Sequence, residues 1–166
     1  MKEIQLSQGY VALIDDEDFE RVSKFKWHVK VDTHTNYAAR NVREGGKHTG
    51  LRLHRFVLGI NNPKISVDHR NGNGLDCQKH NLRSCTQEQN AANRRKQVSS
   101  SRYKGVTWFK RLGNWAVKLQ AQNQSIYVGN FASELDAALA YDVAARKHFG
   151  EFANTNFQEN LCTSVQ

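Results

Sequence analysis

A short stretch that combines an acid, an imidazole and amides is the part of this 166-residue sequence best suited to chemistry. Asp68 and His69 end the β-prone run 65–67, and the Asn-Gly-Asn-Gly sequence at 71–74 supplies the glycines that a tight reversal needs. Asn90 follows in a predicted helix. Carboxylate and amide oxygens suit a hard cation such as Mg²⁺, which keeps most of its waters. We therefore predict that Asp68 and Asn90 hold one Mg²⁺ ion, with Mn²⁺ as an alternative, and that no small-molecule cofactor is needed.

The imidazole of His69 stands beside the predicted ligand Asp68 and titrates near neutral pH. Such a group can take a proton from a water that attacks a phosphodiester, while the ion stabilises charge on the phosphate and the leaving oxygen. Adjacent residues of a regular strand point to opposite faces, so the two side chains can share a site only where the strand twists or ends. The glycine-rich turn after His69 predicts such an end.

A second strand and a capped helix are predicted downstream of the turn. The strand lies near 82–85, and the Thr-Gln-Glu-Gln sequence at 86–89 is a capping box that predicts a helix over 87–95, with Asn90 in its second turn. The order strand, loop, strand, helix can bring a strand end and a helix face to one ion. The alternative is a turn-rich hairpin whose polar side chains only hydrogen-bond the loop, but the spacing, loop and capped helix together favour the metal site.

This unit resembles the HNH nucleases with their ββα-metal core, in the homing-endonuclease branch of phages and mobile introns. The matching letters fall on His69, Asn81 and Asn90, with Asp68 before the histidine, and the last position is Asn where other branches have His. The resemblance implies that Asp68 and Asn90 are metal ligands, that His69 is the general base, and that the Asn81 amide ties the loop backbone of the active site. It implies hydrolysis of one phosphodiester per active site, and we expect a monomer on double-stranded DNA.

Basic residues are concentrated in one block of the sequence. Lysine and arginine number 24 against 16 acidic residues, a formal net charge of +8. No acid stands between Glu88 and Glu134, where the basic residues are Arg94, Arg95, Lys96, Arg102, Lys104, Lys110, Arg111 and Lys118. A solvated surface normally mixes signs, so this block predicts binding to nucleic acid. Its polar part, 94–102, is predicted to be a linker that either lies along DNA or is a solvated tether.

The C-terminal part has its own pattern of strands and a helix. Three β-prone stretches, 103–108, 115–120 and 125–129, are separated by turn residues and predict an antiparallel sheet. Ser133 caps a predicted helix that ends at Gly150. The residues at helical spacing, which we expect to face the sheet, are Leu135, Ala138, Tyr141, Ala145 and His148.

The stretch from about Tyr103 to Phe157 resembles the APETALA2/ethylene-response-factor DNA-binding domain of plants. The matching sequences are Tyr103-Lys104-Gly105-Val106, Gly129-Asn130-Phe131, Ala137-Ala138, Ala140-Tyr141-Asp142 and Asn156-Phe157. In that family the sheet enters the major groove. The resemblance therefore implies DNA contacts by Lys104, Thr107, Lys110, Lys118, Gln120 and Tyr127. Alternation along the strands places Lys118, Gln120 and Tyr127 on the open face of the sheet.

The departures from the plant pattern limit what carries over. This chain has Lys, Thr, Gln and Tyr where the plant family has arginines and a tryptophan on that face. The way in which the plant sheet docks on DNA can apply to this chain, whereas the DNA sequence that the plant family recognises does not. The alternative is a small α+β domain with solvated lysines.

Together these patterns predict an α+β protein with two modules. Residues 1–93 form an α+β scaffold that carries the ββα-metal motif at about 65–95, residues 94–102 form the basic linker, and residues 103–160 form the APETALA2-like domain, a three-stranded antiparallel sheet packed on one helix. The predicted function is site-specific, metal-dependent nicking of DNA, of the homing type. The alternative is a non-catalytic, sequence-specific DNA-binding regulator with a relic HNH unit.

The remaining cysteine and histidine residues leave smaller questions. Three cysteines, no signal sequence and no long apolar run predict a cytoplasmic protein, in the host cytoplasm if a phage encodes it, without membrane partner or disulfide framework. Cys77, His80 and Cys85 could be grouped around zinc, but a structural zinc site needs four ligands and usually a Cys-x-x-Cys pair. His54 is either a packed histidine or, with Arg55, a contact to phosphate near the metal.

Overall fold

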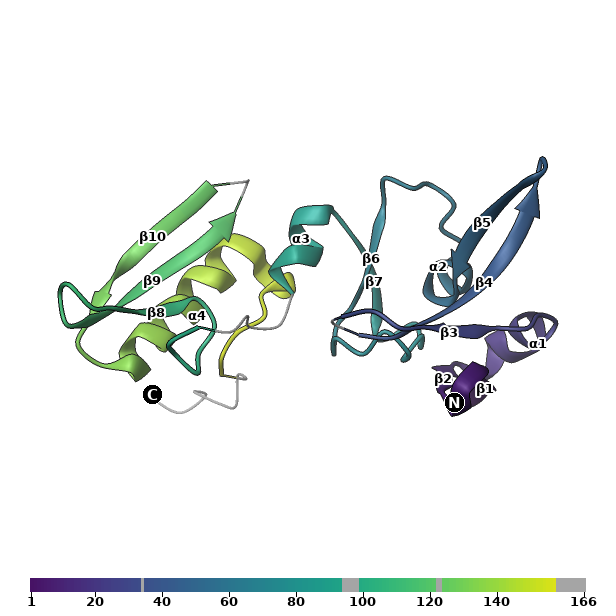
Figure 1. Cartoon of the computed structure of the whole chain (residues 1–166), viewed down its shortest axis with the longest axis horizontal. Coiled ribbons are helices and arrows are strands. Elements are labelled where there is room, and N and C mark those ends of the chain that lie inside the picture. The colour runs from purple at the N-terminus through teal and green to yellow at the C-terminus, as the bar shows by residue number, and fades with distance from the viewer. Residues whose placement is uncertain (34, 94–98, 122–123, 158–166) are drawn as a thin grey trace, which may run out of the picture. The chain divides into compact units, whose positions relative to one another are not determined.

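The computed structural model describes residues 1–33, 35–93, 99–121 and 124–157 (Figure 1). These residues form four small antiparallel sheets and four α-helices, which confirms the predicted α+β class. The chain divides into two compact units, Met1–Gln87 and Glu88–Gln166. The predicted module limits, at 93 and 103, remain predictions.

The first unit begins as an α+β scaffold. Its first sheet pairs β1 (Lys2–Gln5) with β2 (Val11–Ile14) around the 3-10 turn η1 (Ser7–Gly9). The turn η2 (Asp16–Asp18) and helix α1 (Phe19–Ser23) follow. The second sheet has the order β3-β4-β5, with β3 (His28–Lys30), β4 (Tyr37–Glu44) and β5 (Lys47–Arg52). Helix α2 (Leu53–Leu58) starts directly after β5, and Gly59 ends it in the left-handed region at φ +67.

The hairpin with the predicted chemistry is fixed to this scaffold. It consists of β6 (Ser66–His69) and β7 (Leu82–Cys85), which pair antiparallel. Val67 and Leu82 belong to the buried core that also contains Ile14, Val22 and Leu53. The loop between the strands is tied to β2, because the Leu13 carbonyl accepts a hydrogen bond from the Cys77 amide at 2.8 Å. Burial of Val67 and Leu82 in the core and these backbone bonds set the register of the hairpin.

The second unit begins with the short helix α3 (Gln87–Ala92), which ends earlier than the predicted residue 95. Two side chains from further along the chain bind its last carbonyls. Lys104 Nζ donates to the Ala92 carbonyl at 2.6 Å, and Asn154 Nδ2 donates to the Asn93 carbonyl at 2.8 Å. Polar side chains that satisfy the last carbonyls end a helix in this way.

The predicted three-stranded sheet and the helix packed on it are confirmed. The strands β8 (Val106–Phe109), β9 (Asn114–Ala121) and β10 (Gln124–Phe131) pair antiparallel in the order β10-β9-β8, and α4 (Glu134–Phe149) packs across them before the turn η3 (Gly150–Phe152) (Figure 1). Val117 and Leu119 are buried, whereas Lys118, Gln120 and Tyr127 are exposed, as the alternation predicted.

The face that α4 turns toward the sheet differs from the prediction at two residues. Leu135 is 49% exposed and His148 is also exposed. The buried face carries Ala138, Tyr141, Asp142 and Ala145. Asp142 is 1% exposed because its carboxylate accepts hydrogen bonds from the backbone amides of residues 156 and 157, so the helix is rotated to bury an acid that hydrophobic spacing alone does not place.

None of the helices in the described part of the chain combines the length and apolar character that crossing a bilayer requires.

Candidate functional site

The turn after β6 uses its glycines for two different reasons. Gly72 has a φ of +70°, and its amide donates to the His69 carbonyl at 2.9 Å, so the chain reverses directly after the histidine. Gly74 is needed for close approach, since a Cβ there would lie 2.8 Å from the Tyr37 ring and 2.5 Å from the Asn36 carbonyl oxygen. The reversal predicted from the Asn-Gly pairs is therefore present, and it brings the loop against β4.

The side chain of Asn81 holds the two ends of this loop together. Its Oδ1 accepts from the Asn71 amide at 3.0 Å, and its Nδ2 donates to the Asp76 carbonyl at 2.8 Å. Asn81 is 3% exposed, so both bonds are protected from water. This is the geometry of a residue that fixes the loop backbone, and the membership of Asn81 in an active site remains a prediction.

The predicted metal ligand Asp68 forms a buried ion pair with Arg83. The two residues stand directly opposite in the register of β6 and β7. Asp68 Oδ2 lies 2.7 Å from Nη2 and accepts from Nε at 2.8 Å. Asp68 is 4% exposed and Arg83 9%. The carboxylate of Asp68 thus has a cationic partner inside the protein.

His69 belongs to a cluster of three rings from three elements. Its ring centroid lies 4.9 Å from that of His54 on α2, in an edge-on arrangement, and 5.9 Å from that of Tyr37 on β4. Tyr37 and His54 are 5.6 Å apart. Both histidines are buried, at 4% and 5% exposure. His54 is thus a packed histidine, one of the two alternatives that the sequence left open.

Burial keeps both imidazoles neutral. Desolvation lowers the pKa of His69 to about 4, against the opposing charges of Asp68 and Asp76. Desolvation also lowers the pKa of His54 well below its usual value, and the positive charge of Arg52 acts in the same direction on both rings. At neutral pH His69 therefore has a nitrogen lone pair and can accept a proton.

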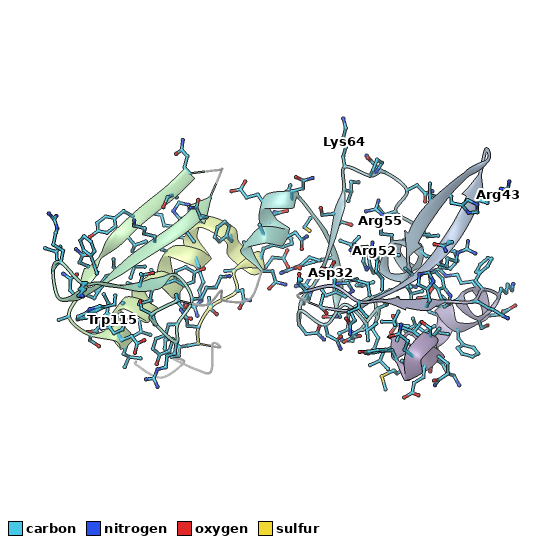
Figure 2. All side chains as sticks on the ribbon, in the orientation of Figure 1. Asp32, Arg43, Arg52, Arg55, Lys64 and Trp115 are labelled. Carbon is cyan, nitrogen blue, oxygen red and sulfur yellow. The ribbon has the colours of Figure 1, made fainter. Side chains whose placement is uncertain are left out.

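Two arginines beside the ring cluster have different partners (Figure 2). Arg55 donates to the carbonyls of Ile65 and Asn62, both at 2.7 Å, and so ties the segment before β6 to α2. Arg52 lies over the Tyr37 ring, with its Cζ 4.3 Å from the ring centroid. Arg55, for which a phosphate contact was one alternative, thus already binds two backbone carbonyls.

The other predicted ligand, Asn90, lies on α3, in the second unit of the chain. Among the residues that the structure describes, no group of three or more His, Cys, Asp or Glu side chains is placed to hold a metal. The carboxylate of Asp68 is an oxygen ligand of the kind that suits a hydrated Mg²⁺ ion, which takes few protein ligands, and the shared site of Asp68 and Asn90 stays a prediction. This pair does not fit zinc, whose structural sites need four nitrogen or sulfur ligands.

The two cysteines of the zinc alternative are buried thiols. Burial raises the pKa of Cys77 to about 12 and that of Cys85 to about 11, so without a metal both are protonated. Metal-bound cysteine is a thiolate, and a zinc ion would have to displace both protons. Zinc at these residues stays the alternative that the sequence left open.

The second unit presents the predicted DNA contacts on one open face of its sheet. Tyr127 stands directly opposite Lys118 in the register of β10 and β9, and Tyr127 is 56% exposed. The predicted contact residues that are exposed on this face or in the adjoining turn are Thr107, Lys110, Arg111, Lys118, Gln120 and Tyr127. In the same sheet, Trp108 and Trp115 stand opposite in the register of β8 and β9 and pack edge to face, with 4.9 Å between their ring centroids. Trp115 is labelled in Figure 2.

The remaining predicted DNA contacts lie elsewhere. Arg94, Arg95 and Lys96 lie outside the described residues. Arg102 is exposed beside Glu134, at 3.9 Å. The ammonium of Lys104 binds the end of α3, and burial lowers its pKa to about 8. A contact between Lys104 and DNA remains a prediction.

Sequence reasoning missed three residues around His69. Tyr37 begins β4 and Arg52 ends β5, and no sequence motif connects either residue to His69. Arg83 follows the motif residue Asn81 by two positions, and a basic residue on the second strand of a hairpin with an acid on the first is a signal that could have found it.

Comparisons with known proteins find one relative that matches most of the chain and others that match less of it. An uncharacterized HNH endonuclease of Acanthamoeba polyphaga mimivirus is 30% identical over 155 residues, which cover 90% of this chain and 76% of that protein. A strand hairpin with buried Asp68 and His69, in a chain with this similarity, defines the class: the protein belongs to the HNH endonuclease family.

Parts of the chain also match plant proteins. An AP2-like ethylene-responsive transcription factor of Arabidopsis thaliana is 44% identical over 80 residues, 45% of this chain. An AP2/ERF and B3 domain-containing transcription repressor of the same plant is 28% identical over 113 residues. The matches span only 16% and 26% of those two proteins. No family model matches the chain.

Proposed function

We propose that this protein is a DNA endonuclease of the homing type, which reads a site with its C-terminal sheet and hydrolyses one phosphodiester with the hairpin of β6 and β7. The observation that carries the proposal is the position of His69, a buried neutral imidazole at the end of a strand, next to Asp68, whose carboxylate contacts Arg83. The family of the chain and its similarity to plant AP2-like transcription factors support the same substrate, double-stranded DNA.

The protein residues have separate roles in this proposal. His69 takes the proton from the attacking water, since its nitrogen is unprotonated at neutral pH. Asn81 keeps His69 in place by closing the loop that follows it. Asp68 and Asn90 hold one Mg²⁺ or Mn²⁺ ion, which when bound stabilises the negative charge on the phosphate.

Binding to DNA is proposed for the open face of the second sheet. Lys118 and Tyr127 lie side by side there, and they combine a cation for phosphate with an aromatic ring and hydroxyl for base edges. One active site per chain then gives a nick in one strand.

A plasmid assay tests the function. The protein is incubated with a supercoiled plasmid library of genomic fragments, with Mg²⁺, with Mn²⁺ and with EDTA, and nicked circles are separated on a gel. We expect nicking at a defined site with either metal and none with EDTA.

The second candidate is a DNA-binding regulator without catalysis. The observation in its favour is that Arg83 already pairs with the proposed metal ligand Asp68. Specific binding in the same assay without nicking in either metal would establish this candidate and reject the nuclease.

A further inference from the structure

Arg52 is connected to the proposed base through one aromatic ring. It ends β5 directly before α2, and its Cζ lies 4.3 Å from the centroid of the Tyr37 ring. That ring lies 5.9 Å from the His69 ring and 5.6 Å from the His54 ring. The guanidinium group thus borders the ring cluster that contains His69.

The guanidinium of Arg52 has no counter-ion within the described ranges 1–33, 35–93, 99–121 and 124–157, where it makes neither an ion pair nor a hydrogen bond. Three other arginines of the same unit are engaged: Arg21 binds Asp18, Arg55 binds the Ile65 carbonyl, and Arg83 binds Asp68. Arg52 is also only partly exposed, so water compensates its charge incompletely. A cation in this state favours binding of an anion.

The neighbours of Arg52 make it the group best suited to that anion. A guanidinium offers donors in a planar fork that matches two oxygens of a phosphate. Stacking on Tyr37 fixes the plane of this fork before DNA arrives.

We propose that Arg52 binds a phosphate of the DNA strand beside the bond that is cut, with Tyr37 as the platform that orients it. The inference deepens the proposed nuclease function and rests on it for the catalytic part. When the water attacks, negative charge grows on the phosphate oxygens, and the two N–H donors of Arg52 stabilise that charge. Loss of one oriented donor to such an oxyanion typically slows a reaction about 10²-fold or more.

Two substitutions and a matched control test the proposal in the full chain. Arg52→Met keeps a long side chain on Tyr37 without the charge, and Arg52→Lys keeps the charge without the fork. Arg43→Met is the control, because Arg43 is exposed on β4 of the same sheet and lies toward the far end of the β4–β5 hairpin (Figure 2). Nicking of supercoiled plasmid is followed with excess protein, so that one rate constant reports the bound complex.

We expect Arg52→Met to slow nicking at least ~10²-fold and Arg52→Lys at least ~10-fold, with Arg43→Met near the wild-type rate. Guanidinium ion added to the solution should restore part of the Arg52→Met rate and leave Arg43→Met unchanged, which a merely structural role would not produce. Wild-type rates for both Arg52 variants, or equal losses in the Arg52 and Arg43 variants, would overturn the proposal. If Arg52→Met melts below the assay temperature, the lysine variant decides.

Measuring DNA affinity in EDTA tests the phosphate contact of Arg52 independently of nuclease activity. The dependence of log Kd on log salt should become shallower by about 0.9 in Arg52→Met, the contribution of one phosphate contact. An unchanged slope would show that Arg52 does not bind phosphate. A shallower slope in a protein that never nicks would reject the nuclease and keep the phosphate contact, whereas nicking that survives His69→Ala would reject only the assigned base.

Discussion

The carboxylate of Asp68 and the guanidinium of Arg83 form a buried ion pair across β6 and β7, with 2.7 Å between Oδ2 and Nη2. The register of the hairpin places the two residues directly opposite, so the pair is a consequence of the same strand pairing that positions His69. The proposed metal ligand therefore has a protein partner already. A divalent ion must share this carboxylate with Arg83.

Asp68→Asn should raise the Mg²⁺ concentration needed for nicking or abolish nicking, because it removes the anionic ligand. Asparagine keeps an oxygen that can accept from Arg83, so it should destabilise the fold less than alanine, which would leave a buried cation unpaired at a cost of about 3–5 kcal/mol. Nicking is measured against Mg²⁺ concentration together with thermal melting. Asp76→Asn is the control, since Asp76 lies in the same loop and its carboxylate accepts a hydrogen bond from the side-chain amide of Asn71. Equal metal dependence in wild type and Asp68→Asn would place the ion elsewhere.

His69→Ala should slow nicking at least ~10²-fold and leave the Kd for DNA near the wild-type value, because general-base catalysis typically contributes that much and the ring is buried. His80→Ala is the matched control, since His80 is exposed at the end of the same loop. Single-turnover nicking and filter binding give the two quantities. A base other than His69 is indicated if the His69→Ala protein cleaves normally between pH 6 and 9.

The buried histidines should make stability depend on pH in a defined window. The pKa of His69 is about 4 in the fold, below its usual 6.5, and that of His54 is also lowered. The unfolded chain thus binds protons first as the pH falls, so the free energy of unfolding should decrease from pH 6.5 to pH 4, by about 3 kcal/mol for His69 alone. Above pH 6.5 this contribution should be constant.

Urea denaturation at several pH values measures this effect. His69→Gln and His54→Gln should each flatten the dependence between pH 4 and 6.5, while His80→Gln should follow the wild type. Parallel curves for all four proteins would mean that the buried histidines do not take up protons on unfolding.

Lys118→Ala and Tyr127→Ala should each weaken binding to the recognised site by roughly 1–3 kcal/mol and change the preferred sequence, if these side chains reach base edges. Lys147→Ala is the control, because Lys147 is exposed on α4, which covers the other face of the sheet. Selection of random duplexes by each protein reports the preference. Equal weakening on all DNA sequences would assign both residues to phosphate contacts.

Removal of the whole C-terminal half would be a poor test of the same division of labour. The last carbonyls of α3 are bound by Lys104 and Asn154, so a chain cut before Tyr103 would lose the groups that end this helix. Asn90, the second proposed ligand, lies on that helix. Point substitutions on the open face of the sheet leave α3 intact, so they separate recognition of the DNA sequence from cleavage of the DNA.

Local patterns in the sequence determined most of the elements. The Asn-Gly pairs predicted the reversal after His69, and alternation in β9 and β10 predicted that Lys118 and Tyr127 share the open face. These features depend on backbone sterics and a two-residue period, which neighbouring residues set. The capping box likewise predicted α3, but its end depended on residues more than ten positions away.

Only the tertiary structure decided what surrounds the proposed base. Tyr37 on β4 and His54 on α2 contact His69, and Arg52 at the end of β5 contacts Tyr37, because the scaffold core packs these elements against the hairpin. Desolvation in that packing, rather than any neighbour in the sequence, makes both imidazoles neutral. The rotation of α4 was decided in the same way, because the buried Asp142 had to reach the amides of residues 156 and 157. A sequence records the spacing of such groups, whereas burial and partner choice arise from contacts between segments that are distant along the chain.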